Sequence, residues 1–362
     1  MVKTIYFWQN IPSPHQVPYQ RELAEMGYRV VLVVDLEMLP NRTKMGWEVP
    51  SLGKIELRVN LSWAEKQQIL DKEDLGDINL VSGVRGCRDG GRITDYCIAQ
   101  GLYVGWIVES WDNRGWRGFL RWWRYRIEAL RYRNRLSRIL VMGDKGVSAY
   151  RSVGYSDSLV KRFGYVVDAP NVQVSDKRFY AQHKKAVEIV YVGSLYHGKG
   201  IDLLFDALSR LQDKEWVLRI IGEEREPGRY REIAKNLGIA DRLLWEGVQN
   251  KIRVYDALMA ADLLVLPSRY DGWGAVVNEA LLCGTPVVCS DAAGASCVLS
   301  EELGDVFPSE DLDSLKSLLA ARILRGPISK ELRERIRANA DLRISARAMA
   351  DLLCKSALPS NR

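Results

Sequence analysis

The sequence is poor in the residues that usually build metal or disulfide sites. Only three histidines occur in 362 residues, so a site with several histidine ligands is not expected. The six cysteines form no C-x-x-C pair, and Cys283 and Cys289 lie in apolar runs that suit small buried side chains. This cysteine usage is typical of a reducing compartment, and we expect a cytoplasmic protein.

Long hydrophobic runs are also missing. No stretch approaches the roughly 20 apolar residues that a membrane-spanning helix requires. The N-terminus, MVKTIYFWQNIPSPHQ, has a brief apolar stretch before polar residues and prolines, which predicts a first strand and not a secretory signal. The 47% of hydrophobic residues can nevertheless build ordinary cores, and the length suits two domains of about 150 residues each.

The net charge of +6 is concentrated in one segment. Between Trp111 and Arg138 there are nine arginines and only two acidic residues, so the rest of the chain is close to neutral. At about 100° per residue, this segment predicts a helix with a basic face beside an apolar stripe. The basic face comprises Arg117, Arg121, Arg124, Arg131, Arg135 and Arg138, the stripe comprises Trp116, Leu120, Trp123, Ile127 and Leu130, and Trp122, Arg126 and Arg133 lie opposite.

Three interpretations of this helix are open. The stripe could pack on a sheet and leave a solvated basic face, or the arginines could bind nucleic acid, although no nucleic-acid motif accompanies them. We favour docking to an anionic membrane surface, because arginine and tryptophan together suit the headgroup layer. The residues expected to touch the membrane are Trp116, Arg117, Arg121, Trp122, Trp123 and Arg124.

Short apolar runs alternate with helix-like segments along most of the chain. One series runs through residues 3–9, 28–35, 78–84, 103–110 and 137–143, and a second through 187–193, 215–223, 242–248, 262–268 and 286–291. Such alternation predicts an α/β fold of two Rossmann-like, doubly wound domains that face each other across a cleft. We expect an N-terminal domain at 1–168, a linker at 169–186, a C-terminal domain at 187–340, and a helix at 341–362 that packs back on the N-terminal domain.

Residues 190–202, VYVGSLYHGKGID, have the form of a phosphate-binding loop between a strand and a helix. An ATPase is disfavoured, because Gly200 stands where the Mg²⁺-binding hydroxyl belongs and the acidic Asp35 lies in the other predicted domain. The loop can still bind a phosphate. Lys199 supplies a positive charge, and the helix expected to begin near Ile201 supplies unpaired N–H groups.

A second informative stretch places Asp271 and Glu279 on either side of seven residues that include Gly272 and Gly274. An acidic pair at a helix start is often a cap and a solvated side chain. In the same domain as a phosphate loop, the pair instead favours recognition of sugar hydroxyls.

Together these blocks resemble the retaining glycosyltransferases of family 4, which have the GT-B fold. The resemblance is strongest over residues 187–300 and looser in the N-terminal half. It implies that the C-terminal domain binds a nucleotide-diphosphate sugar, with Lys199 on the diphosphate, Glu279 on the ribose and Asp271, in place of the usual Glu, on the donor sugar. The remaining donor contacts that it implies are Gly193, Ser194, Gly247, Val248, Gly272, Trp273, Gly274 and Ala275.

The resemblance also implies residues that border the cleft. Glu109 stands where many relatives carry a catalytic histidine or acid, and Ser13, His15 and His197 lie on loops that would face the ligands. Ser194 replaces an arginine that the family often has, and Arg269 is the residue that could substitute for it.

The implied chemistry is metal-independent transfer with retention and without a cofactor. The D-x-D spacing of Asp311 and Asp313 is interpreted as a helix N-cap and not as a metal site. With the membrane-type helix, the resemblance favours a lipid-linked or lipopolysaccharide-type acceptor, as in O-antigen assembly, at the cytoplasmic face of the membrane. An epimerase-like or phosphorylase-like nucleotide-sugar enzyme, a non-catalytic relative and a transferase with a soluble acceptor remain as alternatives.

Overall fold

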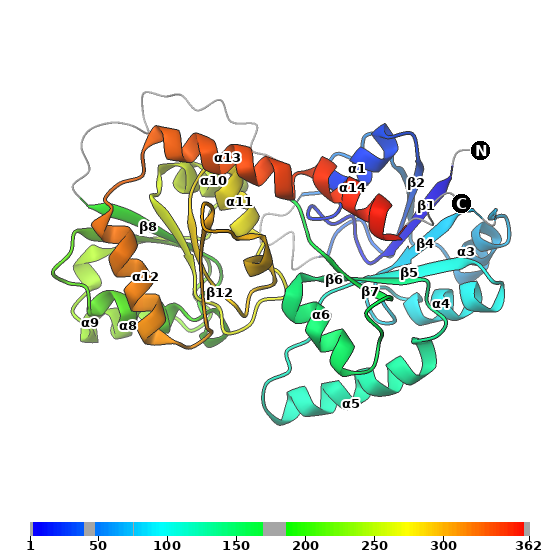
Figure 1. Ribbon diagram of the computed structural model, residues 1–362, viewed down its shortest axis with the longest axis horizontal. Coiled ribbons are helices and arrows are strands. Elements are labelled where there is room, and N and C mark those ends of the chain that lie inside the picture. Colours follow the sequence, from blue (N-terminus) through cyan, green and yellow to red (C-terminus); the bar gives the residue numbers. More distant parts are fainter. Residues whose placement is uncertain (1–2, 40–47, 75, 169–185, 358–362) are drawn as a thin grey trace. The chain divides into compact units, whose positions relative to one another are not determined.

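The computed structural model describes residues 3–39, 48–74, 76–168 and 186–357. These form two compact units, one built from 1–168 with 345–362 and the other from 169–344 (Figure 1). The predicted linker lies outside the described residues except for Ala186.

The first unit is built on a parallel seven-stranded sheet in the order β3-β2-β1-β4-β5-β6-β7. The chain leaves β1 toward β2 and later returns to β4 on its other side, so the strand order reverses between β1 and β4. In open α/β sheets ligands bind at such a reversal, beyond the carboxyl ends of the strands. The strands are β1 (Thr4–Gln9), β2 (Arg29–Val34), β3 (Glu56–Val59), β4 (Ile78–Val81), β5 (Tyr103–Val108), β6 (Arg138–Met142) and β7 (Val160–Phe163).

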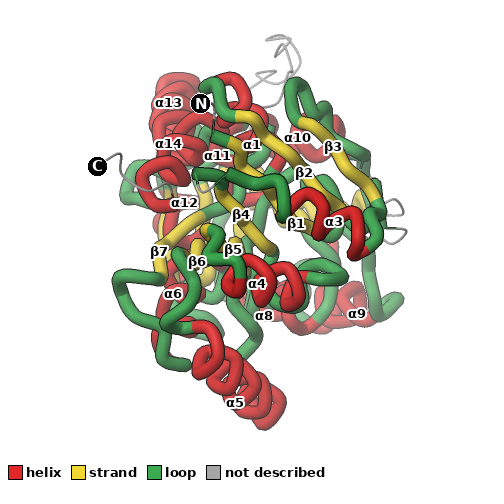
Figure 2. Tube along the Cα trace, turned by 90° about the vertical axis from the view of Figure 1, so that its right-hand side faces the viewer, coloured by secondary structure: helices red, strands yellow, loops and turns green. Residues whose placement is uncertain are grey.

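Both faces of this sheet are covered, which explains why β1 is buried along its whole length. Tyr6 and Trp8 join a core with residues of α4 and α5, while Phe7 points the other way and its ring centroid lies 6.2 Å from that of Tyr19 on α1. The C-terminal helix α14 packs against α1, as Figures 1 and 2 show, and Tyr103 donates a hydrogen bond to the carbonyl of Ala357. The helices are α1 (Val17–Glu25), α3 (Trp63–Leu70), α4 (Gly90–Ala99), α5 (Gly115–Tyr132), α6 (Gly143–Ser152) and α14 (Ala346–Ala357).

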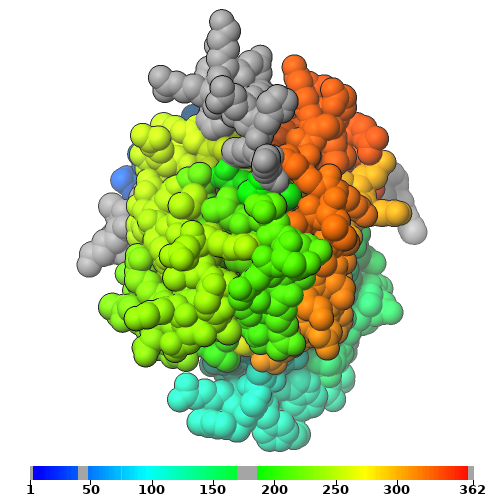
Figure 3. Space-filling view, turned by 90° about the vertical axis from the view of Figure 1, so that its left-hand side faces the viewer, coloured from blue at the N-terminus to red at the C-terminus, as the bar shows by residue number. Residues whose placement is uncertain are grey.

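The second unit has a parallel six-stranded sheet in the order β10-β9-β8-β11-β12-β13, which reverses between β8 and β11. Its strands are β8 (Val187–Val192), β9 (Trp216–Ile221), β10 (Leu243–Gly247), β11 (Leu263–Leu266), β12 (Val287–Ser290) and β13 (Gly304–Phe307). The helices α9, α8 and α12 pack side by side and form the surface shown in yellow-green, green and orange in Figure 3. The helices are α8 (Ile201–Ser209), α9 (Arg229–Asn236), α10 (Lys251–Ala260), α11 (Val276–Leu282), α12 (Leu312–Leu324) and α13 (Lys330–Ile344).

The predicted strands of both series are confirmed, and so is the helix cap at Asp311, whose Oδ1 accepts from the Ser314 N–H at 2.9 Å. Six other elements, β3, β7, β13, α3, α6 and α13, were not predicted. The β3 strand has no buried residue, so it lacks the apolar run that marked the other strands.

Gly200 fixes how the start of α8 packs on the end of β11. It has φ +68°, and a Cβ at this position would lie 1.9 Å from the carbonyl oxygen of Pro267. The neighbouring Gly198 carbonyl accepts a 2.9 Å hydrogen bond from the Arg269 N–H. Only glycine fits this close, left-handed position, so the loops after β8 and β11 are held against each other.

We expect Gly200→Ala to destabilise the second unit more than Gly228→Ala. Both glycines are left-handed residues that precede a helix, but nothing lies within 4 Å of a Cβ at Gly228 (φ +80°). Gly228→Ala should cost only the left-handed penalty of about 1–2 kcal/mol, whereas Gly200→Ala should add about 1–3 kcal/mol of overpacking. Urea unfolding of both variants measures the difference, and equal midpoints would contradict the packing role of Gly200.

Candidate functional site

The loops beyond the carboxyl ends of the second sheet are joined by backbone hydrogen bonds. Gly193 N–H donates to Ile221 at 2.9 Å, and Gly222 N–H donates to Gly247 at 2.8 Å. A Cβ at Gly222 would lie 1.9 Å from the Gly193 carbonyl oxygen, so the loops after β8 and β9 touch backbone to backbone. The segments expected to bind the phosphates and the base therefore form one continuous rim.

Lys199 and Asp271 are in direct contact on this rim. The Lys199 Nζ forms an ion pair with the Asp271 carboxylate, and their side chains are 20% and 14% exposed. Lys199 ends the 3₁₀ turn His197–Lys199 before α8, and Asp271 follows β11, so the pair bridges the reversal of strand order. Asp271 is held in turn by the loop after β12, because Gly294 N–H donates to its carbonyl at 3.2 Å.

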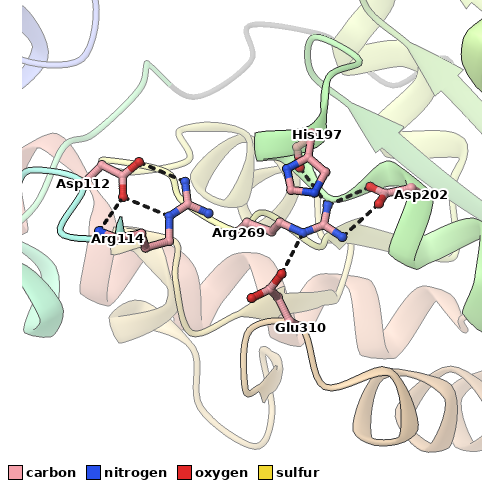
Figure 4. A network of polar contacts seen from close by, with 6 residues as sticks. All are labelled: Asp112, Arg114, His197, Asp202, Arg269 and Glu310. Atoms are coloured by element: carbon pink, nitrogen blue, oxygen red, sulfur yellow. Dashed lines mark hydrogen bonds and ion pairs between the residues drawn. The ribbon is translucent and has the colours of Figure 1, made fainter. Parts of the chain in front are cut away.

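Arg269 is engaged by residues of its own unit (Figure 4). Its guanidinium donates to both carboxylate oxygens of Asp202 at 2.7 and 2.8 Å, to Glu310 at 3.1 Å and to the His197 carbonyl at 2.7 Å. Hydrogen bonding to Asp202 raises the pKa of Arg269 above its ordinary value, although burial opposes this. Two carboxylates thus compensate the charge of Arg269, and its contacts tie the turn at His197 to the first turn of α8.

Glu279 lies in the first turn of α11 and is partly buried. Among the described residues, none forms a hydrogen bond or ion pair with its carboxylate. Burial raises the pKa of Glu279 above its ordinary value, and the positive charge of Lys251 offsets this only in part. A desolvated carboxylate of this kind has capacity to accept hydrogen bonds from a ligand.

The other predicted donor residues differ in how far their side chains are accessible. Trp273 is buried, and its indole N–H donates to Asn278 Oδ1 at 2.9 Å, so this position can offer a ligand its backbone only. Val248 and His197 are exposed, while the Ser194 carbonyl accepts a 3.0 Å hydrogen bond from the Tyr191 hydroxyl. Gly274 has φ +89° and lies two residues before α11 begins at Val276, while Gly272 and Ala275 are partly exposed.

The first unit contains a pocket of about 390 Å³ at its own reversal of strand order. Its walls come from the loops after β1, β4 and β5, and they include the predicted Ser13, His15 and Glu109. Tyr165 donates a 2.8 Å hydrogen bond to Glu109 Oε1, and the rings of Tyr165 and His15 lie 6.1 Å apart. Burial raises the pKa of Tyr165, and the Glu109 charge raises it further.

Arg85 and Glu128, which the sequence analysis did not select, form an ion pair in the wall of this pocket. Arg85 Nη1 lies 2.6 Å from Glu128 Oε2, and its guanidinium carbon lies 4.9 Å from the ring centroid of Tyr125. Burial raises the pKa of Glu128, and Arg85 partly offsets the effect. The signal available in the sequence was that Glu128 is the single acid within the arginine-rich helix.

The apolar stripe of α5 faces solvent. Trp116, Leu120, Trp123, Ile127 and Leu130 are 50–69% exposed, and Phe119 is exposed beside them. The interpretation in which this stripe packs on the sheet is therefore wrong. The helix contacts its unit through the opposite side, which includes Gly118, Ala129 and Tyr132, and it lies at the lower edge of that unit in Figures 1 and 2.

Trp122, which was expected to touch a membrane together with the stripe, lies on a different side of the helix from the stripe. It is partly buried in the core, and its indole N–H donates to Ser152 Oγ on α6 at 3.2 Å. Arg126 lies on the same inner side and donates to the Val153 carbonyl at 2.9 Å. Among the basic residues, Arg117 and Arg124 are exposed, whereas Arg121 is partly buried and donates to the Asp112 carbonyl at 2.8 Å.

In the described part of the chain, no helix is both long and apolar enough to cross a membrane. No cluster of three or more histidine, cysteine, aspartate or glutamate side chains suited to a metal ion occurs among the same residues.

Comparison with known proteins finds similarity that is concentrated in the second unit. Residues 173–343 match the family described as Glycosyl transferases group 1. Over 210 residues, the chain is 29% identical to the lipopolysaccharide core biosynthesis mannosyltransferase LpsB of Rhizobium meliloti (strain 1021). This match covers 48% of this chain and 59% of the relative. It is 33% identical over 173 residues to mannosylfructose-phosphate synthase of Agrobacterium fabrum (strain C58), which covers 44% and 37%. The chain therefore matches these relatives over part of their length only.

Solved structures match over almost the whole chain. The lipopolysaccharide outer core galactosyltransferase WaaB has a TM-score of 0.73 at 16% identity, and Anabaena HepE in complex with UDP has 0.71 at 15%, each with 98% of this chain and 99% of the other covered. The second unit thus resembles the glycosyl transferases group 1 family over residues 173–343, and the chain has the GT-B fold of two Rossmann-like domains.

The raised pKa of Glu279 predicts how stability changes with pH. Because the fold favours its protonated form, ionised Glu279 destabilises the protein above the unfolded pKa of about 4.3, and the loss grows as pH rises through the folded pKa. Glu279→Gln cannot ionise, so we expect it to raise Tm at pH 7.5 by roughly 2 °C and to leave Tm unchanged below pH 4. Thermal unfolding at both pH values measures this. The exposed control Glu301→Gln should shift neither, and a lower Tm for Glu279→Gln at pH 7.5 would contradict the assignment.

Proposed function

We propose that this protein is a retaining, metal-independent glycosyltransferase of family 4. It moves a sugar from a nucleotide-diphosphate donor to a lipid-linked or lipopolysaccharide-type acceptor at the cytoplasmic face of the membrane. The observation that carries the proposal is the contact of Lys199 with Asp271 at the reversal of strand order in a group 1 glycosyltransferase domain. The structural neighbour with bound UDP and the similarity to LpsB support the donor and acceptor classes.

The geometry suits stabilisation of a diphosphate leaving group. Lys199 immediately precedes Gly200 and α8, whose first N–H groups point away from the helix along its positive dipole end. Preorganised charge of this kind is usually the largest catalytic contribution when negative charge develops in the transition state. Asp271 would orient Lys199 and accept a hydrogen bond from the donor sugar, and Glu279 would accept hydrogen bonds from the ribose hydroxyls.

Arg269 would support this site without touching the donor. Asp202 lies in the first turn of α8, where an uncompensated carboxylate would repel a diphosphate. The paired hydrogen bonds from Arg269 neutralise Asp202 and also fix the turn that carries Lys199. We therefore assign Arg269 a positioning role. It does not replace the cation that is missing at Ser194, but it holds the turn that carries Lys199.

The exposed stripe of α5 supports a membrane-bound acceptor. Its aromatic and aliphatic side chains are flanked by exposed arginines, and this combination suits the headgroup layer of an anionic bilayer. The same helix contributes Glu128 and Tyr125 to the pocket of the first unit. Docking of α5 on the membrane would therefore bring that pocket close to a lipid-anchored acceptor.

We expect Lys199→Ala to lower kcat by about a hundredfold or more, the usual scale for losing one preorganised donor to a developing charge. Turnover is measured with the nucleotide sugar found by screening UDP-, GDP- and TDP-sugars for protection against thermal unfolding. The exposed control Lys235→Ala should retain wild-type kcat. No protection by any donor, or unchanged turnover of Lys199→Ala, would contradict the assignment of the donor site.

The membrane part of the proposal predicts salt-sensitive binding to vesicles. The wild type should sediment with phosphatidylglycerol-containing liposomes at low salt, remain in the supernatant with neutral phosphatidylcholine liposomes, and be released as salt rises. The triple change Trp116→Ser, Phe119→Ser, Trp123→Ser should abolish sedimentation and leave donor binding intact. Leu342→Ser, which removes an exposed leucine of α13, is the matched control. Equal recovery with anionic and neutral liposomes would remove the membrane claim.

A further inference from the structure

We propose that the pocket of the first unit binds a neutral sugar ring of the acceptor and excludes phosphate groups, with Arg85, Glu109 and Glu128 as the residues that make this distinction. The inference rests on the proposed transferase function for its assignment to the acceptor. It goes beyond that function by naming the chemical class of the group that enters the pocket.

The charges in the pocket wall carry the argument. Among the described residues that line it, the only lysine or arginine is Arg85, whereas Glu109 and Glu128 are both acidic. The single guanidinium is already paired with Glu128 at 2.6 Å. Among these described lining residues, a phosphate would therefore meet no uncompensated lysine or arginine. It would lie against two carboxylates, and like charges brought together in this way disfavour binding.

Backbone N–H groups at the start of α1 do not replace the missing cation. Helix N-termini bind anions through unpaired N–H groups in their first turn. Here the N–H groups of Gln16 and Val17 both donate to the Ser13 carbonyl, at 3.0 and 2.9 Å, and Pro18 has no N–H. This end of the pocket therefore adds little attraction for an anion.

The same wall suits sugar hydroxyls. The Glu128 side chain is 8% exposed, and its one hydrogen bond to a described residue is the bond that Oε2 accepts from Arg85, so Oε1 can accept from a hydroxyl. Glu109 accepts from Tyr165 at 2.8 Å, which fixes a second carboxylate, and Tyr150 adds an aromatic wall. A volume of about 390 Å³ lies in the range of small-molecule pockets, roughly 300–1,000 Å³.

Packing holds these groups in place before a ligand arrives. The ring of Tyr125 stacks on Trp111 with centroids 4.0 Å apart, and the guanidinium of Arg85 lies over the same ring. Arg85 is thus fixed by both Glu128 and Tyr125, which come from the same helix, α5. Preorganised polar groups of this kind discriminate strongly between ligands that satisfy them and ligands that do not.

The experiment compares neutral and phosphorylated forms of the same sugars on the full chain. Methyl α-glycosides of glucose, mannose, galactose and N-acetylglucosamine are titrated by calorimetry beside the 6-phosphates of these sugars. We expect at least one neutral glycoside to bind, and its 6-phosphate to bind roughly tenfold or more weakly. Tighter binding of the phosphorylated form, or no binding of any neutral glycoside, would overturn the proposal.

Variants locate the effect in the pocket. Glu128→Gln should weaken binding of the neutral glycoside roughly tenfold. It should also reduce the difference in affinity between the glycoside and its 6-phosphate, because Arg85 then no longer has a carboxylate partner. The exposed control Glu48→Gln should change neither affinity. If Glu128→Gln fails to fold, Tyr165→Phe tests the same wall, since it keeps the ring and removes the hydroxyl that donates to Glu109. Unchanged selectivity in a folded variant would contradict the proposal.

The outcome can be separated from that of the proposed function. Protection by nucleotide sugars reports on the second unit and does not involve the pocket. Donor binding without selectivity for neutral glycosides would leave the transferase intact and remove this inference. Selective glycoside binding without any donor binding would support the selectivity of the pocket and contradict the proposed transferase function.

Discussion

The close packing of the loops after β8 and β11 is the constraint on which the candidate donor site depends. Gly200 sits against the Pro267 carbonyl in a left-handed conformation, and the Gly198 carbonyl accepts from Arg269. Because these backbones are fixed, the side chains of Lys199 and Asp271 lie close enough to form an ion pair. Residues 72 positions apart in the sequence thereby become one charged pair at the edge of the sheet.

Both units repeat one architectural solution with different chemistry. In each, a parallel sheet reverses its order at an inner strand, and the chemically useful side chains follow the strands on either side of the reversal. The second unit presents a lysine and helix N–H groups there, which suits a phosphate. The first presents two carboxylates with one paired arginine, which suits hydroxyls. Under the proposed function, the donor diphosphate and the acceptor sugar would be distinguished by the charge at equivalent positions of related folds.

Helix α5 joins two properties that its sequence alone left separate. Its inner side supplies Glu128 and Tyr125 to the pocket, and its outer side exposes the apolar stripe with flanking arginines. Because one rigid helix carries both sides, a surface that binds the stripe necessarily acts close to the pocket. The arginines of this helix differ in their contacts, since Arg126 donates a hydrogen bond to the Val153 carbonyl while Arg117 is exposed.

The sequence by itself determined the α/β class, most strands and the glycine turn before α8, because buried parallel strands are continuous apolar runs and glycine marks a left-handed turn. Its spacing and its family resemblance also selected Lys199, Asp271 and Glu279 as candidate donor contacts. Only the tertiary structure decided what required contacts between distant segments. It paired Arg269 with Asp202 and Arg85 with Glu128, turned Trp122 inward and exposed the stripe of α5. Helical periodicity divides a helix into faces, but the face that becomes buried depends on which neighbours the rest of the chain brings to it.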